Sequence, residues 1–201
     1  MSHPLGANAS RVLGVPAIDY APDFLAADEA DRLLAELTRA LPWHQPRLRL
    51  YGREHPIPRQ QVWMGDSAYR YSGKTFTPTP WHPSVRQLRD HLERSLASQA
   101  GTWRFNSVLL NRYRGGTDRM GWHSDDEPQL GPGPCIAAVT LGVPRPLRFR
   151  FKDRSAPAFN VWLEHGSLLL MGAGVQERLE HALLPRKIEG ERLNLTFRWL
   201  R

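Results

Sequence analysis

The sequence predicts an α+β protein, with two amphipathic helices followed by short antiparallel strands that build a sandwich or jelly roll. Two observations lead to this fold class. In the first half of the chain, apolar residues recur at helical spacing in two segments. After Gly101 the pattern changes to short segments rich in β-branched, aromatic or Leu residues, each bounded by Gly, Pro or Asp. At 201 residues the chain is long enough for one core and needs no second domain.

The two helices are expected at residues 28–41 and 84–99. Leucines of the first share one face, and Pro42 marks its end. In the second, Ser84 is the expected N-cap residue and Gly101 lies beyond the end. Both segments are typical of helices that cover a core.

The remaining elements are strands and loops. Residues 47–80 combine aromatic, proline and basic residues without a helical period, so we expect short strands and long loops there. The strands expected after Gly101 are residues 105–113, 136–141, 147–151, 167–171 and 193–200. Residues 1–20 are rich in Pro, Gly and Ala and are expected to be a flexible segment before a single domain at 21–201.

The charge balance favours a polyanionic partner. Lys and Arg number 27 against 20 Asp and Glu, a formal net charge of +7. Arginine supplies most of the excess, and it can grip phosphate bidentately and stack on bases, which favours nucleic acid. A GC-rich genome that encodes more Arg and Ala is the alternative explanation.

Other features limit where the protein works. No window approaches the roughly 20 apolar residues of a membrane span, and the first residues do not resemble a secretory signal. Cys135 is the only cysteine, which excludes intramolecular disulfides and thiolate zinc sites. We therefore expect a soluble, cytoplasmic monomer without a membrane partner.

The segment GWHSDDEPQL, residues 121–130, carries the first chemical signal. His123 and Asp125 are separated by one residue, so in an extended segment both side chains leave on one face. Non-haem Fe(II) sites use two histidines and one carboxylate on one side of the metal. The second histidine has two candidates, His165 and His181. The competing interpretation of the acidic cluster is a solvated loop or a helix start.

The last expected strand carries the second signal. Arg192, Asn194, Thr196 and Arg198 alternate with apolar residues, so one face holds two guanidinium groups. The strand is either half-exposed or lines the interior of a jelly roll. In the interior, two buried arginines require an anionic partner, and a dicarboxylic cosubstrate would satisfy both.

In this order, the motifs resemble the AlkB family of Fe(II)/2-oxoglutarate dioxygenases that dealkylate nucleic acids. The resemblance covers residues 50–201 and is carried by Asn111-x-Tyr113, His123-x-Asp125, His181 and Arg192-x-Asn194-x-x-x-Arg198. It is closest to the branch acting on duplex DNA, in which two more acids follow the metal motif. The segment Tyr69-Arg70-Tyr71-Ser72-Gly73 also matches that branch, which often has Phe at the position of Tyr71.

The resemblance implies a fold and a set of cofactors. The fold is a double-stranded β-helix (jelly roll) core at about 103–201 with N-terminal covering helices, and a nucleotide-recognition region at about 47–80. His123, Asp125 and His181 would hold Fe(II), and O2 would be a cosubstrate. Arg192 would pair with the distal carboxylate of 2-oxoglutarate, with Arg198 near its metal-bound end. The further hydrogen bonds to 2-oxoglutarate would come from Asn111, Tyr113 and Asn194.

The resemblance also implies substrate contacts. Tyr69 and Tyr71 would stack on an extruded base. Asp126 and Glu127 would favour a cationic lesion such as 1-methyladenine or 3-methylcytosine over the neutral base. The stretch RLRLYGREHPIPRQ resembles the loop with which the duplex-acting branch inserts an aromatic residue into the base stack. Its expected DNA contacts are Leu50, Tyr51, Gly52, Arg53 and Arg59.

The expected function is oxidative repair of alkylated DNA, in which an N-methyl group is hydroxylated and lost as formaldehyde, with succinate and CO2 as coproducts. One alternative is the same chemistry on RNA, a protein, a lipid or a small molecule. A second is a nucleic-acid-binding module that has lost catalysis.

Overall fold

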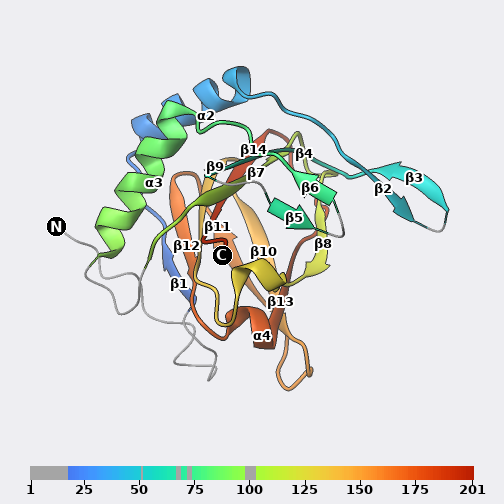
Figure 1. Cartoon of the computed structure of the whole chain (residues 1–201). Helices are drawn as coiled ribbons and strands as arrows, with labels where there is room; N and C mark the ends of the chain where they lie inside the picture. The colour runs from blue at the N-terminus through green and yellow to red at the C-terminus, as the bar shows by residue number, and fades with distance from the viewer. Residues whose placement is uncertain (1–17, 51, 67–68, 72–73, 98–102) are drawn as a thin grey trace.

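The structure is a computed structural model that describes residues 18–50, 52–66, 69–71, 74–97 and 103–201. Two antiparallel sheets face each other and form a double-stranded β-helix, with two long helices outside it (Figure 1). The predicted α+β jelly roll with covering helices is therefore confirmed.

The larger sheet has six strands in the spatial order β1-β12-β9-β14-β7-β4. Its strands are β1 (Ile18–Ala21), β12 (Ser167–Met171), β9 (Ile136–Gly142), β14 (Arg192–Arg198), β7 (Ser107–Tyr113) and β4 (Gln60–Gly65). Strand β14 lies between β9 and β7, with Asn194 opposite both Thr140 and Asn111. This register places the polar face of β14 beside the polar residues of both neighbours.

The smaller sheet has four strands in the order β11-β10-β13-β8. They are β11 (Phe159–Leu163), β10 (Arg145–Phe151), β13 (Leu179–Leu183) and β8 (Met120–His123). We did not expect β8, β11 or β13, which are only four or five residues long. His181 on β13 pairs with His123 on β8, so this sheet brings together two histidines that are far apart in the sequence.

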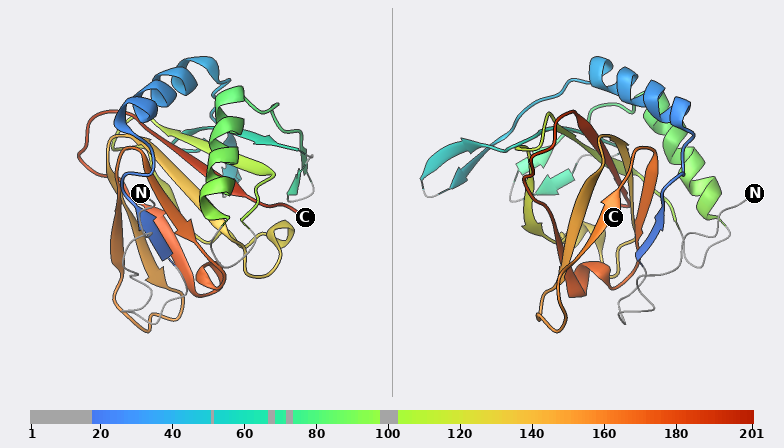
Figure 2. Two further views of the ribbon diagram at one scale, coloured as in Figure 1. Left: turned by 90° about the vertical axis from the view of Figure 1, so that its left-hand side faces the viewer. Right: turned by 180° about the vertical axis from the view of Figure 1, so that it is seen from behind.

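Helices α2 (Ala27–Ala40) and α3 (Pro83–Leu96) pack on the outer face of the larger sheet (Figure 2). Their apolar faces and the sheet share one core, to which α2 contributes Leu33 and Leu37. A second core fills the space between the two sheets around Phe149 and Leu169. The short helix α4 (Val175–Arg178) and the 3-10 turn η1 (Pro128–Leu130) lie near the site. None of the helices in the described ranges is long and apolar enough to cross a bilayer.

Two expectations are corrected at the helix and strand starts. Ser84 is not the N-cap of α3: His82 takes that place, because Pro83 has a fixed φ that suits the first helical position. The Ser84 hydroxyl instead donates to Glu36 at 2.6 Å and joins the two helices. Residues 18–20, which we placed in a flexible segment, belong to β1, where Ile18 is buried and pairs with Met171.

Two small hairpins lie outside the two main sheets. Strands β2 (Arg47–Leu50) and β3 (Arg53–Pro56) form a hairpin that projects away from the body (Figure 1). Strands β5 (Tyr69–Tyr71) and β6 (Lys74–Phe76) form a second hairpin closer to the barrel. The short strands and loops expected at residues 47–80 match these hairpins.

Candidate active site

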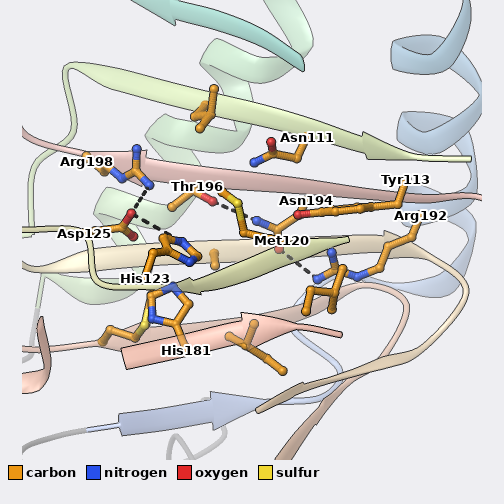
Figure 3. Close-up of a pocket in the computed structure, with 15 residues that line it drawn as sticks. Asn111, Tyr113, Met120, His123, Asp125, His181, Arg192, Asn194, Thr196 and Arg198 are labelled. Atoms are coloured by element: carbon orange, nitrogen blue, oxygen red, sulfur yellow. Dashed lines mark hydrogen bonds and ion pairs between the residues drawn. The ribbon is translucent and has the colours of Figure 1, made fainter. Parts of the chain in front are cut away.

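Three side chains with metal-ligating atoms meet between the sheets. One ligand atom each from His123, Asp125 and His181 lies within 4.8 Å of the other two (Figure 3). His123 ends β8, and Asp125 follows two residues later, just beyond the strand. His181 comes from the middle of β13, directly opposite His123 in the sheet. The cluster has two imidazoles and one carboxylate, as predicted from the motif.

The hydrogen bond of His123 leaves one ring nitrogen for a metal. Its Nδ1 lies 2.9 Å from the carbonyl oxygen of Gly121. Because a carbonyl only accepts, Nδ1 carries the proton and Nε2 keeps a free lone pair. Nε2 is the atom that faces Asp125, at 4.0 Å from its Oδ1.

Burial and neighbouring charges set the protonation of the other two groups. Burial, with a smaller contribution from the neighbouring His123, lowers the pKa of His181 to about 4, so the ring is neutral at physiological pH. Burial alone would raise the pKa of Asp125, but Arg198 and the two histidines outweigh it and lower the pKa. Neutral imidazole and ionised carboxylate are the forms that bind metal ions.

Two contacts hold Asp125 in place. Its Oδ1 accepts a hydrogen bond from Arg198 at 2.6 Å, and its backbone N–H donates to Oε1 of Gln176 at 2.9 Å. Gln176 is buried on α4, and sequence analysis did not identify it. Glutamine in a short amphipathic segment carries no local signal for this role.

The opposite faces of β8 and β13 carry their own interactions. Trp122 lies under the Arg150 guanidinium, 3.9 Å from the ring centroid, and Arg150 donates to Glu180 at 2.7 Å. Trp122 and Glu180 adjoin His123 and His181 in sequence, so alternation sends them to the outer side. The outer contacts stabilise the strand pairing that brings the two histidines together.

The far end of the pocket contains a buried arginine (Figure 3). Arg192 is 2% exposed, and its Nη2 donates to Thr140 Oγ1 at 3.0 Å and Asn194 Oδ1 at 2.9 Å. Its Nε has no hydrogen-bond partner, and no carboxylate of the described residues pairs with it. Burial lowers the pKa of Arg192 to about 10. This interior position decides between the alternatives we left open for the last strand, because its polar face lines the barrel.

A second buried arginine, Arg145, contacts the same tyrosine as Arg192, and sequence analysis did not identify it. Arg145 is 1% exposed and donates to the backbone oxygens of Asp118 and Leu184, both at 2.9 Å. The guanidiniums of Arg145 and Arg192 lie 5.5 and 5.4 Å from the ring centroid of Tyr113. Arg145 therefore ties the turn before β8 and the end of β13 to Tyr113. A lone arginine after Pro144 gives no sequence signal that it is buried.

Asn111 lies in the same pocket with Arg59 as its partner. The Nε of Arg59 donates to Asn111 Oδ1 at 2.8 Å, which leaves the amide nitrogen of Asn111 free to donate. We expected Arg59 to contact DNA; in the structure its guanidinium bonds to the pocket residue Asn111, because Arg59 directly precedes β4 and β4 pairs with β7. Burial lowers the pKa of Arg59.

The two acids that follow Asp125 differ in their surroundings. Asp126 is exposed and accepts from Lys152 Nζ at 3.2 Å, so its charge is partly offset. Glu127 caps η1 through its backbone, and its side chain forms no ion pair with a described residue. Tyr69 and Tyr71 lie on β5, for which the structure gives the backbone pairing with β6.

The β2–β3 hairpin has the turn that the sequence requires. Leu50 pairs with Arg53, and Gly52 between them has a φ of +79°, which favours glycine. Gly52 and Arg53 are exposed at the tip. Tyr51, the expected wedge, lies outside the described residues.

His165 is far from this cluster. Its Nδ1 accepts from the backbone N–H of Gly142 at 2.8 Å, and its Nε2 lies 3.3 Å from Asp31 on α2. These contacts join a loop of the barrel to the first helix. The structure thus gives His165 a structural position and places His181 beside His123.

Comparisons with known proteins agree with this geometry. The 2OG-Fe(II) oxygenase superfamily matches residues 17–198. Human DNA oxidative demethylase ALKBH2 is 37% identical over 183 residues, covering 85% of this chain and 68% of the relative. Human alpha-ketoglutarate-dependent dioxygenase alkB homolog 3 is 34% identical over 198 residues, covering 92% and 66%. The solved structure of OsALKBH1 has a TM-score of 0.63 at 18% identity, covering 92% of this chain and 98% of that one, which shows the fold.

Two histidines and a carboxylate on one side of a cavity are the ligand set of non-haem Fe(II) oxygenases. This chain belongs to the 2OG-Fe(II) oxygenase superfamily. Membership implies an Fe(II) dioxygenase with 2-oxoglutarate and O2 as cosubstrates. The described side chains fit these groups, because the triad offers three metal-ligating atoms and Arg192, which lines the same pocket, has a buried Nε without a hydrogen-bond partner.

Proposed function

We propose that this dioxygenase repairs alkylated DNA by oxidative dealkylation, removing N-methyl groups such as those of 1-methyladenine and 3-methylcytosine. One observation carries the proposal. A single pocket contains both the cluster of His123, Asp125 and His181 and the buried, unpaired Nε of Arg192. The name of one human relative, DNA oxidative demethylase ALKBH2, supports a DNA substrate. The net charge of +7 supports a polyanion.

His123, Asp125 and His181 are the proposed iron ligands, and Arg198 orients Asp125. Arg192 is proposed to receive the distal carboxylate of 2-oxoglutarate, since that anion would balance its buried charge. Asn111, Tyr113 and Asn194 line the same pocket and would donate further hydrogen bonds. When bound, iron with 2-oxoglutarate and O2 supplies the oxidising power that hydroxylates the methyl group, and the hydroxymethyl product loses formaldehyde.

We propose that residues of β5, of the segment after Asp125 and of the β2–β3 hairpin select the substrate. Tyr69 and Tyr71 are proposed to hold the extruded base between flat side chains. Glu127, without an ion-pair partner among the described residues, is proposed to favour a positively charged lesion. Asp126 would add to that preference less, since Lys152 already faces it. The β2–β3 hairpin, with Leu50, Gly52 and Arg53 at its tip, is proposed to enter the duplex, and Tyr51 is the proposed wedge.

We further propose that the protein acts as a monomer. In the described ranges the exposed large hydrophobic side chains are Trp162 and Trp199, which lie on separate elements and form no broad apolar patch.

The test is formaldehyde and succinate release from oligonucleotides that carry one 1-methyladenine or 3-methylcytosine. Matched strands without the methyl group, and RNA strands of the same sequence, run beside them. Release from methylated DNA that depends on iron and 2-oxoglutarate supports the proposal. Release from the RNA strand alone would move the substrate to RNA, and succinate without formaldehyde from any strand would point to a different substrate class.

A further inference from the structure

A second cavity, of about 300 Å³, opens beside the active site. Its walls are the loop from Leu130 to Cys135 and the end of the chain after β14, together with Arg104. Trp199 forms one wall and is 48% exposed. This cavity shares no residue with the pocket that contains the histidines and Arg192.

Hydrogen bonds fix the framework of this cavity. The backbone N–H of Arg201 donates to Gln129 at 2.9 Å, which joins the chain end to η1. Asn106 donates to the Leu200 carbonyl and accepts from the Leu200 N–H, both at 2.7 Å. The backbone that follows Trp199 is therefore held by hydrogen bonds at both Leu200 and Arg201.

Two arginines and no acidic side chain line the cavity, and Glu177 lies behind its wall, where it accepts from the backbone N–H of Gly133 at 2.7 Å. Arg104 and Arg201 both line it, and neither forms an ion pair with a residue in the described ranges. The remaining walls are apolar or proline, with the half-buried Cys135. A cavity lined by a flat aromatic side chain and two such arginines complements a ligand that has a flat ring and a negative charge.

Trp199 differs from the other exposed tryptophan. Trp162 on β11 is 51% exposed and already lies under the Arg186 guanidinium, 5.7 Å from its ring centroid. Trp199 makes no ring contact with a described side chain. Its face is open for stacking by a ligand.

The residues of this cavity are close in sequence to those of the active site. Its loop begins three residues after Glu127, and Trp199 directly follows Arg198, which is bonded to Asp125. The chain end, the loop after η1 and the β5–β6 hairpin all lie on the same side of the molecule (Figure 2, left). A strand whose lesion enters between β5 and Glu127 would extend toward Trp199.

We propose that this cavity is a subsite for a nucleotide of the same strand more than one position away from the lesion, whose base stacks on Trp199 while Arg104 and Arg201 contact its phosphates. This assignment rests on the proposed function, because it takes the same DNA strand as the substrate. The subsite lies outside the catalytic pocket. Its contribution to affinity should therefore depend on the length of the strand and not on whether a base is methylated.

The experiment compares Trp199→Ala, Trp199→Phe and Arg104→Met with the parent protein, and Trp162→Ala is the matched control. Kinetics are measured on a methylated trinucleotide and on a methylated single strand of about 12 nucleotides, which spans a typical single-strand site. Binding of an unmodified strand of the same length is followed by fluorescence anisotropy over a range of salt concentrations.

For Trp199→Ala we expect about 10-fold weaker binding of the longer strand and a KM raised by a similar factor, since a base loses its stacking partner. Activity on the trinucleotide and kcat on both substrates should stay unchanged. Trp199→Phe should keep most of the affinity. Arg104→Met should lower the salt slope by about 0.7, the value for one phosphate contact on a single strand.

Unchanged binding by Trp199→Ala, equal losses on both strand lengths, or an equal loss in Trp162→Ala would overturn the subsite. The anisotropy measurement needs no turnover, so it separates the two proposals. If the parent protein bound the strand through Trp199 but released no formaldehyde, the proposed repair function would be wrong and the proposed subsite would stand.

Discussion

Arg198 donates a hydrogen bond to Asp125 at 2.6 Å, although Asp125 is also one of the three proposed metal ligands. The contact joins β14 of the larger sheet to the segment after β8 of the smaller one. An arginine partner lowers the pKa of Asp125 and fixes the direction of its oxygens. The metal cluster and the cosubstrate strand are thus coupled before any ligand binds.

The triad assignment predicts loss of turnover in His123→Ala, Asp125→Ala and His181→Ala, because a facial site with two remaining ligands no longer holds iron in reactive geometry. His165→Ala is the matched control, since His165 contacts Gly142 and Asp31 instead. Metal content and formaldehyde release are measured for all four variants. The assignment of His181 would be wrong if His165→Ala lost iron and His181→Ala kept it.

Arg192→Met should raise the apparent 2-oxoglutarate requirement by about 10- to 100-fold, since charge-assisted hydrogen bonds contribute roughly 1.5–3 kcal/mol. Without cosubstrate the variant should be at least as stable as the parent, because a buried charge without a carboxylate partner is removed. Titration with 2-oxoglutarate and thermal unfolding measure the two effects. The exposed Arg148 on β10 provides the control Arg148→Met, and an unaltered 2-oxoglutarate affinity in Arg192→Met would remove Arg192 from the site.

Arg145 is predicted to position Tyr113 and Arg192 without touching the cosubstrate. Arg145→Met leaves the carbonyls of Asp118 and Leu184 unpaired and should lower the free energy of unfolding by about 2–4 kcal/mol. Arg145→Lys keeps the charge and should recover part of the 2-oxoglutarate affinity. The KM for 2-oxoglutarate and kcat are measured for both variants, because loss of positioning should raise KM. If both variants lost kcat equally and kept the parent KM, Arg145 would have a structural role alone.

Metal-free protein is predicted to lose stability as the pH falls from about 6.5 to 4. The folded protein holds the pKa of His181 at about 4, below the ordinary histidine value of 6.5, so in this window the unfolded chain binds the proton first. The loss should approach about 3 kcal/mol at the acid end. Denaturant unfolding at several pH values, with a chelator present, measures the slope. In His181→Leu the slope should be reduced, and an identical slope in that variant would assign it to other groups.

Glu127→Gln should lower activity on cationic 3-methylcytosine more than on a neutral adduct such as ethenoadenine, because only the cationic base is stabilised by the carboxylate charge. The amide keeps nearly the same shape. Asp126→Asn is a useful comparison, and its effect should be smaller because Lys152 lies 3.2 Å from Asp126. Equal losses on both adducts in Glu127→Gln would indicate that Glu127 shapes the loop and does not discriminate charge.

The sequence alone determined the features that depend on neighbouring residues. Leucine spacing located both helices, and alternation in the last strand placed Arg192, Asn194 and Arg198 on one face. His123 and Asp125 were paired by a spacing of two. Each of these follows from the fixed geometry of a helix or strand, which operates over a few residues.

The tertiary structure alone decided which distant residues meet. The choice of His181 over His165 depends on which strand pairs with β8, and the roles of Arg145 and Gln176 depend on where their side chains are buried. Arg59 turns toward Asn111 because β4 lies beside β7. Strand pairing across long stretches of chain is set by the packing of the whole core, and no local pattern records it.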